Sequence, residues 1–351
     1  MMPLKTETTP YKQLTREKVR PVRGTEVAFL ILGTLFLLFL LNWGVLWLEK
    51  AYPYNRGYWL MAQKWERLYA LPEPVEWLIL GDSTGNQGIV PEVLTEQLGG
   101  TAVNLNTVGS MAALDDVWML EAYIEEHGPP PHLLIVHTYQ VWHRDIEPVF
   151  LAKMPIPWQS WENKFEPRVS LTAQEEMDAW LARYFPLYTD NVSLARLIRG
   201  WVYSQRPIFA QRYQLQADGF MRVEISPQAA RVESDMQQHL KYVAFNSFEL
   251  STINQQALSQ LIVLAEAHDI DVYLAFGPLY EGVVENARFQ LYFQQVRAEL
   301  QAFADESEQL HLLETLAVFP ANQMENVDHL IFEAAKTYTG IIAAEIEEKR
   351  P

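Results

Sequence analysis

Residues 77–88, WLILGDSTGNQG, join an apolar run directly to a glycine, an acid, two hydroxyl groups and two further glycines. A loop of this composition suits three kinds of chemistry: holding a phosphate, holding a dinucleotide, or presenting a nucleophile. A phosphate-binding P-loop needs a lysine after its last glycine, and none follows Gly85 or Gly88. The dinucleotide fingerprint G-x-G-x-x-G is missed as well, because the glycines stand at 81, 85 and 88.

Ser83 is therefore the residue of this loop with the best case for chemistry, as a nucleophile. It stands two residues beyond the apolar run, and parallel α/β sheets place their sites beyond the carboxyl ends of the strands. Backbone amides at the start of a following helix can stabilise an oxyanion there. The alternative interpretation is that Asp82, Ser83 or Thr84 only caps that helix.

A nucleophilic serine needs a general base, and the base must be oriented. Of the eight histidines, His329 is the best placed, because it lies in a loop after the last predicted strand and just before the final helix. His143, in the loop after the third predicted strand, is a second candidate. The others lie at helix ends or within strands, where a structural role is the simpler interpretation. We expect the first and last strands to bring Ser83 and His329 together.

The elements that must position these residues alternate along the chain. Short apolar runs predict strands, and amphipathic runs predict helices, closed by glycine at 99 and 128 and capped by serine at 251. This rhythm predicts an α/β fold, a three-layer α/β/α sandwich with a parallel sheet. It is interrupted by an insertion or cap at about 146–250, with a hairpin expected around Asp218 and Gly219. The predicted strands are 76–82, 101–109, 131–140, 270–280 and 310–320, and the predicted helices are 91–100, 112–128, 251–269, 283–307 and 332–349.

The N-terminal fifty residues predict a membrane anchor. Residues 27–48 carry no charge and, at about 1.5 Å per residue, can cross a hydrocarbon core of about 30 Å. Trp43 and Trp47 suit one interface, and the basic residues before the span suit the cytoplasmic side. We therefore expect a cytoplasmic basic tail (1–26), a transmembrane helix (27–48), a linker (49–75) and a periplasmic or extracellular domain (76–348) on a bacterial inner membrane, with the lipid bilayer as a partner.

Composition excludes several classes of function. The chain has no cysteine, which rules out disulfides, thiolate metal sites and a cysteine nucleophile. Residues 49–351 carry 21 basic and 41 acidic side chains, so nucleic acid is not an expected partner. No metal and no cofactor are predicted.

The arrangement of these motifs resembles the SGNH (GDSL-like) hydrolase superfamily. Its members carry a GDS nucleophile after the first strand and an Asp-x-x-His pair before the last helix, and this chain reads LILGDST at 78–84 and ENVDHLIFEAAKTYT at 325–339. With one N-terminal span and an outward domain, it is most similar to the membrane-anchored branch, which includes alginate O-acetylation proteins and the teichoic-acid D-alanylation protein. The resemblance covers roughly 76–145 and 250–348.

This resemblance implies roles for particular residues. Ser83 becomes the nucleophile and His329 the general base, and Gly109 supplies an amide to the oxyanion hole, with Asn104 and Asn106 nearby. Two positions depart from the family pattern. The third block, VHTYQVWHRD, has no asparagine, so Tyr139 or Gln140 must replace it. The position three before the histidine is Asn326 rather than an acid, so either Asn326 or the adjacent Asp328 orients the imidazole.

Two functions from different classes remain open at this point. The first is an esterase or O-acyltransferase acting on cell-envelope or exported polysaccharide through Ser83, His329 and Asp328. The second is a non-catalytic SGNH-fold scaffold that binds a polymer or a multi-pass membrane acyltransferase. The tryptophans at 142, 158, 161 and 180 either stack on sugar rings or form the core of the cap.

Overall fold

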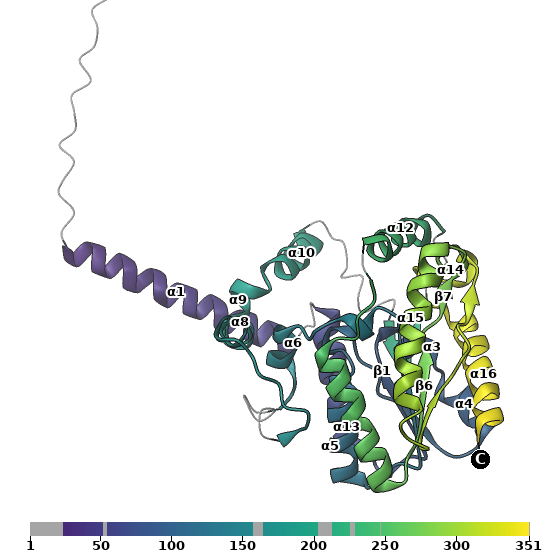
Figure 1. The fold of residues 1–351 in the computed structure, drawn as a ribbon. Helices are drawn as coiled ribbons and strands as arrows, with labels where there is room; N and C mark the ends of the chain where they lie inside the picture. The colour runs from purple at the N-terminus through teal and green to yellow at the C-terminus, as the bar shows by residue number, and fades with distance from the viewer. Residues whose placement is uncertain are drawn as a thin grey trace, which may run out of the picture.

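The centre of the molecule is a parallel sheet of five strands (Figure 1). The structure is a computed structural model that describes residues 24–51, 55–156, 164–202, 213–224, 229–245 and 247–350. Its strands lie in the order β2-β1-β3-β6-β8, which is the order of doubly wound, flavodoxin-like sheets. The predicted α/β fold with a parallel sheet is thus confirmed. The strands are β1 (Trp77–Gly81), β2 (Ala102–Asn104), β3 (His132–His137), β6 (Asp271–Phe276) and β8 (Leu310–Leu312).

The helices between the strands form where the sequence predicts them. Gly99 ends α4 and Gly128 ends α5, both with positive φ, which glycine adopts without strain. Ser251 caps α13, its hydroxyl accepting the backbone N–H of Asn254. The helices are α4 (Pro91–Leu98), α5 (Leu114–His127), α13 (Thr252–His268), α15 (Ala287–Ala304) and α16 (Phe332–Lys349).

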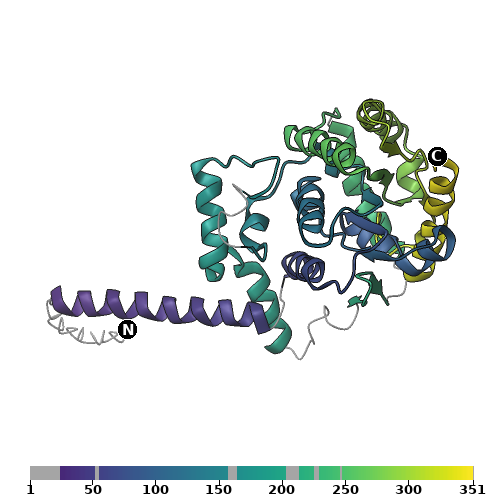
Figure 2. The same cartoon turned by 90° about the horizontal axis from the view of Figure 1, so that it is seen from below.

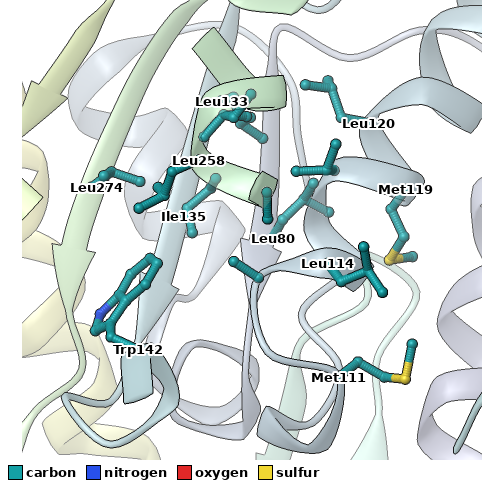
Figure 3. Close-up of a cluster of buried hydrophobic side chains, with 14 of the residues drawn as sticks. Leu80, Met111, Leu114, Met119, Leu120, Leu133, Ile135, Trp142, Leu258 and Leu274 are labelled. Atoms are coloured by element: carbon teal, nitrogen blue, oxygen red, sulfur yellow. The ribbon is translucent and has the colours of Figure 1, made fainter. Parts of the chain in front are cut away.

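Alternate residues of the strands pack into two hydrophobic clusters, as the two-residue period of a strand requires. Leu80, Ile135 and Leu274 pack with α5 and α13 in the larger cluster (Figure 3). Ile79 and Val136, one position away, pack with α4 and α16 in the other. The central strands are therefore buried, which explains their almost uninterrupted apolar sequences.

Two segments differ from the sequence-based expectation. The residues assigned to a linker (49–75) contain a helix, α2 (Arg56–Ala70), whose Trp65 and Leu68 are fully buried in the larger cluster. The strand predicted at 310–320 is split. After β8 the chain leaves the main sheet, and β9 (Val318–Phe319) pairs with β7 (Leu279–Tyr280) instead.

The insertion is mostly helical. The hairpin expected around Asp218 and Gly219 is present as β4 (Tyr213–Leu215) and β5 (Met221–Val223), an antiparallel pair. Trp158 and Trp161 lie outside the described residues. The helices are α6 (Pro148–Lys153), α8 (Ala173–Tyr184), α9 (Pro186–Thr189), α10 (Asn191–Val202) and α12 (Ala229–Phe245).

The N-terminal helix α1 (Gly24–Ala51) projects away from the rest of the molecule (Figures 1 and 2). Its residues Gly24–Leu48 are long and apolar enough to cross a membrane. Most of its large apolar side chains are exposed. In a helix buried in the core of a soluble protein, such side chains are covered by neighbouring residues. The basic tail falls largely within residues 1–23, outside the described part of the chain.

Candidate active site

The short helix α3 (Ser83–Gly88) begins directly after β1, and Asp82 caps it. One carboxylate oxygen of Asp82 accepts the backbone N–H and the hydroxyl of Thr84, at 2.7 and 2.6 Å, and the other accepts the backbone N–H of Thr138 at 2.9 Å. Of the three candidate caps, the structure therefore selects Asp82. Ser83 is partly exposed, and its hydroxyl has no hydrogen-bond partner among the described residues.

Beneath Ser83 lies a buried chain of charges formed by Asp82, His137 and Asp116. His137 Nε2 is 2.5 Å from Asp116, and its Nδ1 is 3.7 Å from Asp82. Burial opposes protonation of His137, yet the two carboxylates raise its pKa to about 10. Burial also raises the pKa of Asp82, but the nearby charge of His137 and the hydrogen bonds from Thr84 and Thr138 together outweigh it and hold that pKa below its usual range. These three groups link the ends of β1 and β3 to the start of α5.

Gly109 lies beside the Ser83 loop, at the start of the 3-10 helix η1 (Gly109–Met111). A Cβ on Gly109 would stand 3.7 Å from the Cβ of Asp82 and 2.9 Å from a methyl group of Val141, so a side chain there has no room. Within the described part of the chain, neither the Gly109 nor the Ser83 backbone N–H has an acceptor. These two amides are donors of the kind that an oxyanion hole requires.

Asn104, expected near the oxyanion hole, is fully committed to the scaffold instead. Its side-chain amide donates to the carbonyls of Gly85 and Ile89, at 3.0 and 2.8 Å. Its side-chain oxygen accepts from Asn106 and from the buried ammonium of Lys64. Asn104 therefore holds α3 in place and has no donor left for a ligand. The Lys64 ammonium also donates to the carbonyls of Asn104 and Gly219, which joins α2 to the hairpin.

His329 is held by both of the residues proposed to orient it. Its Nδ1 lies 2.6 Å from Asp328 Oδ1 and 3.0 Å from Asn326 Oδ1. The Asn326 oxygen also accepts the backbone N–H groups of Asp328 and His329, at 3.1 and 2.8 Å, and this local turn folds the loop back. Adjacent side chains point apart in an extended segment, but not in this turn, so Asp328 reaches the imidazole.

The carboxylate of Asp328 is strongly favoured in its ionised form. Burial raises its pKa, but the imidazole of His329 more than compensates and brings the pKa to about 2, with smaller contributions from His239 and Arg144. A hydrogen bond to Nδ1 selects the tautomer whose lone pair is on Nε2. His329 is thus set up to accept a proton through Nε2.

Gln140 does not offer a donor to the site, contrary to the role expected for it. Its amide nitrogen lies 3.2 Å from both the Tyr139 hydroxyl and His239 Nδ1, and its oxygen accepts Arg144 Nη2 at 2.6 Å. The Tyr139 hydroxyl also lies 3.0 Å from His239 Nδ1. Gln140 and Tyr139 therefore act through their neighbours, and the residue that they place toward the site is Arg144.

Arg144 brings a positive charge to Gly109. Its Nη1 stands 3.6 Å from the position of a Cβ on Gly109, next to the amide described above. It has no carboxylate partner within 4 Å among the described residues. An incompletely paired guanidinium at this position is able to stabilise negative charge.

Two further series of contacts connect the Ser83 loop with the loop that carries His329. On one side, Asp82 adjoins Gly109, Gly109 adjoins Arg144, and the charge of Arg144 acts on Asp328. On the other side, a Cβ on Gly277, just after β6, would collide with Thr84. Three residues beyond Gly277, the Tyr280 backbone N–H donates to the Val327 carbonyl at 2.9 Å, two residues before His329. The Ser83 loop and the His329 loop are therefore linked through neighbouring residues near the carboxyl end of β6.

Ser83 and His329 are nevertheless not joined by a hydrogen bond in this state, since the Ser83 hydroxyl is unpartnered among the described residues. In enzymes without substrate such contacts are often long and tighten only in the complex. The second histidine candidate, His143, packs instead against Tyr242 and Tyr292. Burial and Arg144 lower its pKa to about 4.

His239 and Arg144 were not predicted as site residues from the sequence. His239 comes from α12 in the insertion, where no motif or periodicity marks it, and Arg144 is one of several charges in a polar loop. Trp142, considered as a sugar-stacking residue, is buried against His137 and belongs to the core. Trp180 lies on α8, near α1.

No group of three or more His, Asp or Glu side chains in the described part of the chain is arranged to hold a metal ion. Comparison of the chain with models of known protein families gives no match, and comparison with curated proteins also gives none. Functional conclusions must therefore come from the geometry of the site itself.

Proposed function

We propose that the protein is a membrane-anchored serine esterase or O-acyltransferase of SGNH type, with a three-layer α/β/α domain outside a bacterial inner membrane. The observation that carries the proposal is the bond between His329 Nδ1 and the ionised Asp328, together with the partly exposed hydroxyl of Ser83 at the end of β1. A serine, a histidine and a carboxylate that are joined by hydrogen bonds perform acyl transfer on several unrelated folds.

The first half of the reaction acylates the serine. Ser83 Oγ attacks the carbonyl carbon of an acyl ester, and His329 Nε2 takes the hydroxyl proton. Asp328 stabilises the imidazolium that forms. When the tetrahedral intermediate collapses, the bond to the leaving alcohol breaks, and the imidazolium returns the proton to that alcohol.

The second half releases the acyl group. A water molecule or a sugar hydroxyl attacks the acyl-serine, gives its proton to His329, and regenerates the Ser83 hydroxyl. The insertion supplies His239 beside Asp328, and an insertion that excludes water favours transfer over hydrolysis. A carbohydrate polymer of the cell envelope is the proposed acceptor, and a multi-pass membrane acyltransferase is the proposed source of the acyl group.

The oxyanion is stabilised by the backbone N–H groups of Ser83 and Gly109 together with Arg144. Arg144 replaces the side-chain amide that the family takes from its third block, because Gln140 uses its own amide to bind Tyr139 and His239. The Gln140 oxygen holds the guanidinium against Gly109. A charged donor interacts more strongly with an oxyanion than a neutral amide does.

Covalent labelling tests the proposal directly. The full-length protein in detergent is incubated with a serine-directed fluorophosphonate and, separately, with an activated acetyl ester, and intact mass is measured. We expect one adduct in each case, absent from Ser83→Ala and retained in Ser110→Ala. Ser110 is a matched control because it lies next to Gly109 but its hydroxyl is bound to Glu147 at 2.8 Å. Labelling that survives in Ser83→Ala contradicts the assignment.

The second candidate function is a scaffold that keeps this fold without the chemistry. The lack of a hydrogen-bond partner for the Ser83 hydroxyl among the described residues favours it. If the protein is a scaffold, neither reagent should form an adduct, and the parent and Ser83→Ala proteins should bind a polymer equally well. The labelling experiment therefore separates the two functions.

A further inference from the structure

Asn42 is the one buried polar side chain among the described side chains of the spanning helix α1, and it binds this helix to the insertion. The amide of Asn42 donates to the Tyr184 carbonyl at 2.6 Å, and its oxygen accepts the Leu187 backbone N–H at 3.3 Å. Asn42 is 6% exposed, whereas its neighbour Trp43 is 63% exposed. The junction of α8 and α9 therefore docks on α1, as Figures 1 and 2 show.

Exposed apolar side chains gather around this junction. Outside α1, six of the eleven exposed large apolar residues in the described part of the chain lie between residues 177 and 192. We call them the α8–α9 face. Three of them recur at the i, i+3 and i+7 positions of α8, which places them on one side of that helix. The face consists of Met177, Trp180, Tyr184, Phe185, Tyr188 and Val192.

The other side of these helices is polar or packed against the domain. Ala179 and Ala182 of α8 are buried. The guanidinium of Arg183 donates to the carbonyls of Ala152 and Ile156, and Lys153 is paired with Asp190 at 3.3 Å. These contacts fix the orientation of α8 and α9, so that their aromatic side chains point outward.

The level of this face along α1 matches the edge of a bilayer. Asn42 lies six residues before the end of the apolar segment, or about 9 Å along the helix axis at 1.5 Å per residue. When the 25-residue apolar segment is centred on a hydrocarbon core of about 30 Å, Asn42 lies about 6 Å inside the outer boundary of that core, within the depth of about 5–10 Å to which interfacial helices are buried. Trp43 and Trp47 of α1 are exposed at the same end. In Figure 2, α8 runs across the axis of α1, as a helix lying in the membrane plane does.

We propose that the α8–α9 face lies in the outer interfacial layer of the same bilayer that α1 spans, with phospholipid as its occupant. Tyrosine and tryptophan favour this layer because their rings are apolar and their tips polar. An amphipathic helix binds there by burying its apolar side at the boundary of headgroups and acyl chains. The second attachment fixes the orientation of the domain, and of Ser83, relative to the membrane. The proposal rests on the membrane location in the proposed function, and not on the acyl transfer.

Site-directed spin labelling tests the proposal, because the chain has no native cysteine. Single variants Met177→Cys and Tyr188→Cys are labelled in the full-length protein and reconstituted in phosphatidylcholine vesicles. Collision rates with oxygen, which concentrates in lipid, and with a water-soluble nickel chelate are then measured. Val263→Cys and Leu291→Cys are matched controls, since these apolar residues are also more than half exposed but lie on α13 and α15. Phe36→Cys reports on α1 itself.

We expect the labels at 177 and 188 to have an oxygen-to-nickel ratio several-fold above those at 263 and 291, approaching that at 36. A lipid-like ratio at 36 with control-like ratios at 177 and 188 overturns the proposal and leaves the span intact. A water-like ratio at 36 overturns both the proposal and the membrane anchor, while fluorophosphonate labelling still tests the esterase independently. A high ratio at 177 and 188 that disappears when the protein is diluted in lipid assigns the face to a second copy of the chain, and also overturns the proposal.

Discussion

Replacing Asp328 by asparagine tests the centre of the proposed mechanism, because Asp328 and Asn326 both lie within hydrogen-bond distance of His329 Nδ1. The structure gives a scale for the electrostatic effect. The pKa of Asp328 falls from 3.8 to about 2 although burial opposes the fall. A shift of that size corresponds to about 2.4 kcal/mol of net stabilisation of the charged form, or roughly a 60-fold effect on an equilibrium.

The loss of activity should exceed that value. Burial acts against the shift, and His329 is the largest cause that lowers the pKa, ahead of His239 and Arg144. Replacing the acid of a serine triad by its amide, a measured example, lowers turnover by about 10⁴ because the histidine adopts the wrong tautomer. We therefore expect kcat/KM of Asp328→Asn to fall by about 10²–10⁴, measured by hydrolysis of p-nitrophenyl acetate with fluorophosphonate titration of active sites.

The neighbouring asparagine supplies the control. Asn326→Asp keeps the oxygen that accepts the two backbone N–H groups, and adds a second carboxylate near Nδ1. Since Asp328 is already ionised and closer, this change alone should alter kcat/KM only a few-fold. In the double variant Asp328→Asn, Asn326→Asp, the new carboxylate should restore much of the lost activity, and this coupling is measured by the double-mutant cycle. A mild effect of Asp328→Asn together with no coupling refutes the orienting role of Asp328.

Three further perturbations follow from the same geometry. Ser83→Ala should leave the melting temperature nearly unchanged, since Asp82 and not Ser83 caps α3, and unfolding of this variant contradicts that assignment. Arg144→Gln should lower kcat of the ester assay by about 10²–10³ with little change in melting temperature, because it removes an oxyanion donor, and an unchanged kcat excludes that role. His137→Gln should destabilise the fold by about 3–5 kcal/mol in urea melts, because it leaves Asp116 and Asp82 without a buried counter-charge.

The destabilisation caused by His137→Gln should decrease as pH rises. The folded pKa of His137 is about 10, above the unfolded value of 6.5, so its stabilisation is complete below pH 6.5 and is lost as pH rises toward 10. The difference in unfolding free energy between the parent and His137→Gln should therefore shrink across that range. A difference that stays constant from pH 6 to pH 10 shows that His137 is not charged in the native state.

The parts of the fold that follow from local chemistry are readable from the sequence. Residues 77–81 form a buried strand because both faces of a central parallel strand are covered, and Gly128 ends a helix because it adopts a positive φ. Helix α2 was missed although Met61, Trp65 and Leu68 recur at the i, i+4 and i+7 positions of one helix face. Those residues precede the first strand, so the alternation of strands and helices does not mark them as part of the domain.

The sequence predicts a site residue and its neighbours only where a short local segment determines both the residue and its contacts. The turn of residues 326–329 places Asn326, Asp328 and His329 by hydrogen bonds within four residues. The contact of Gln140 with His239 joins residues 99 positions apart, and depends on how the insertion folds over the sheet. Sequence spacing holds no information on such a contact. For the same reason, the sequence suggests Gln140 as a donor and gives no sign that its amide is already used.

The acid of the GDS element illustrates how one motif can combine two tasks. Asp82 is buried, caps α3, bonds to Thr138 and faces His137, so its charge is used entirely within the fold. A buried ion pair is seldom the most stabilising way to fill a core, because desolvation offsets most of its attraction. What this arrangement provides is position: it fixes the ends of β1 and β3 against each other at the residue that precedes Ser83. A binding scaffold needs no such constraint on a single serine, whereas a nucleophile needs its attacking atom and its oxyanion donors held within a fraction of an ångström. On this reasoning the buried charges beneath Ser83 favour the enzyme over the scaffold.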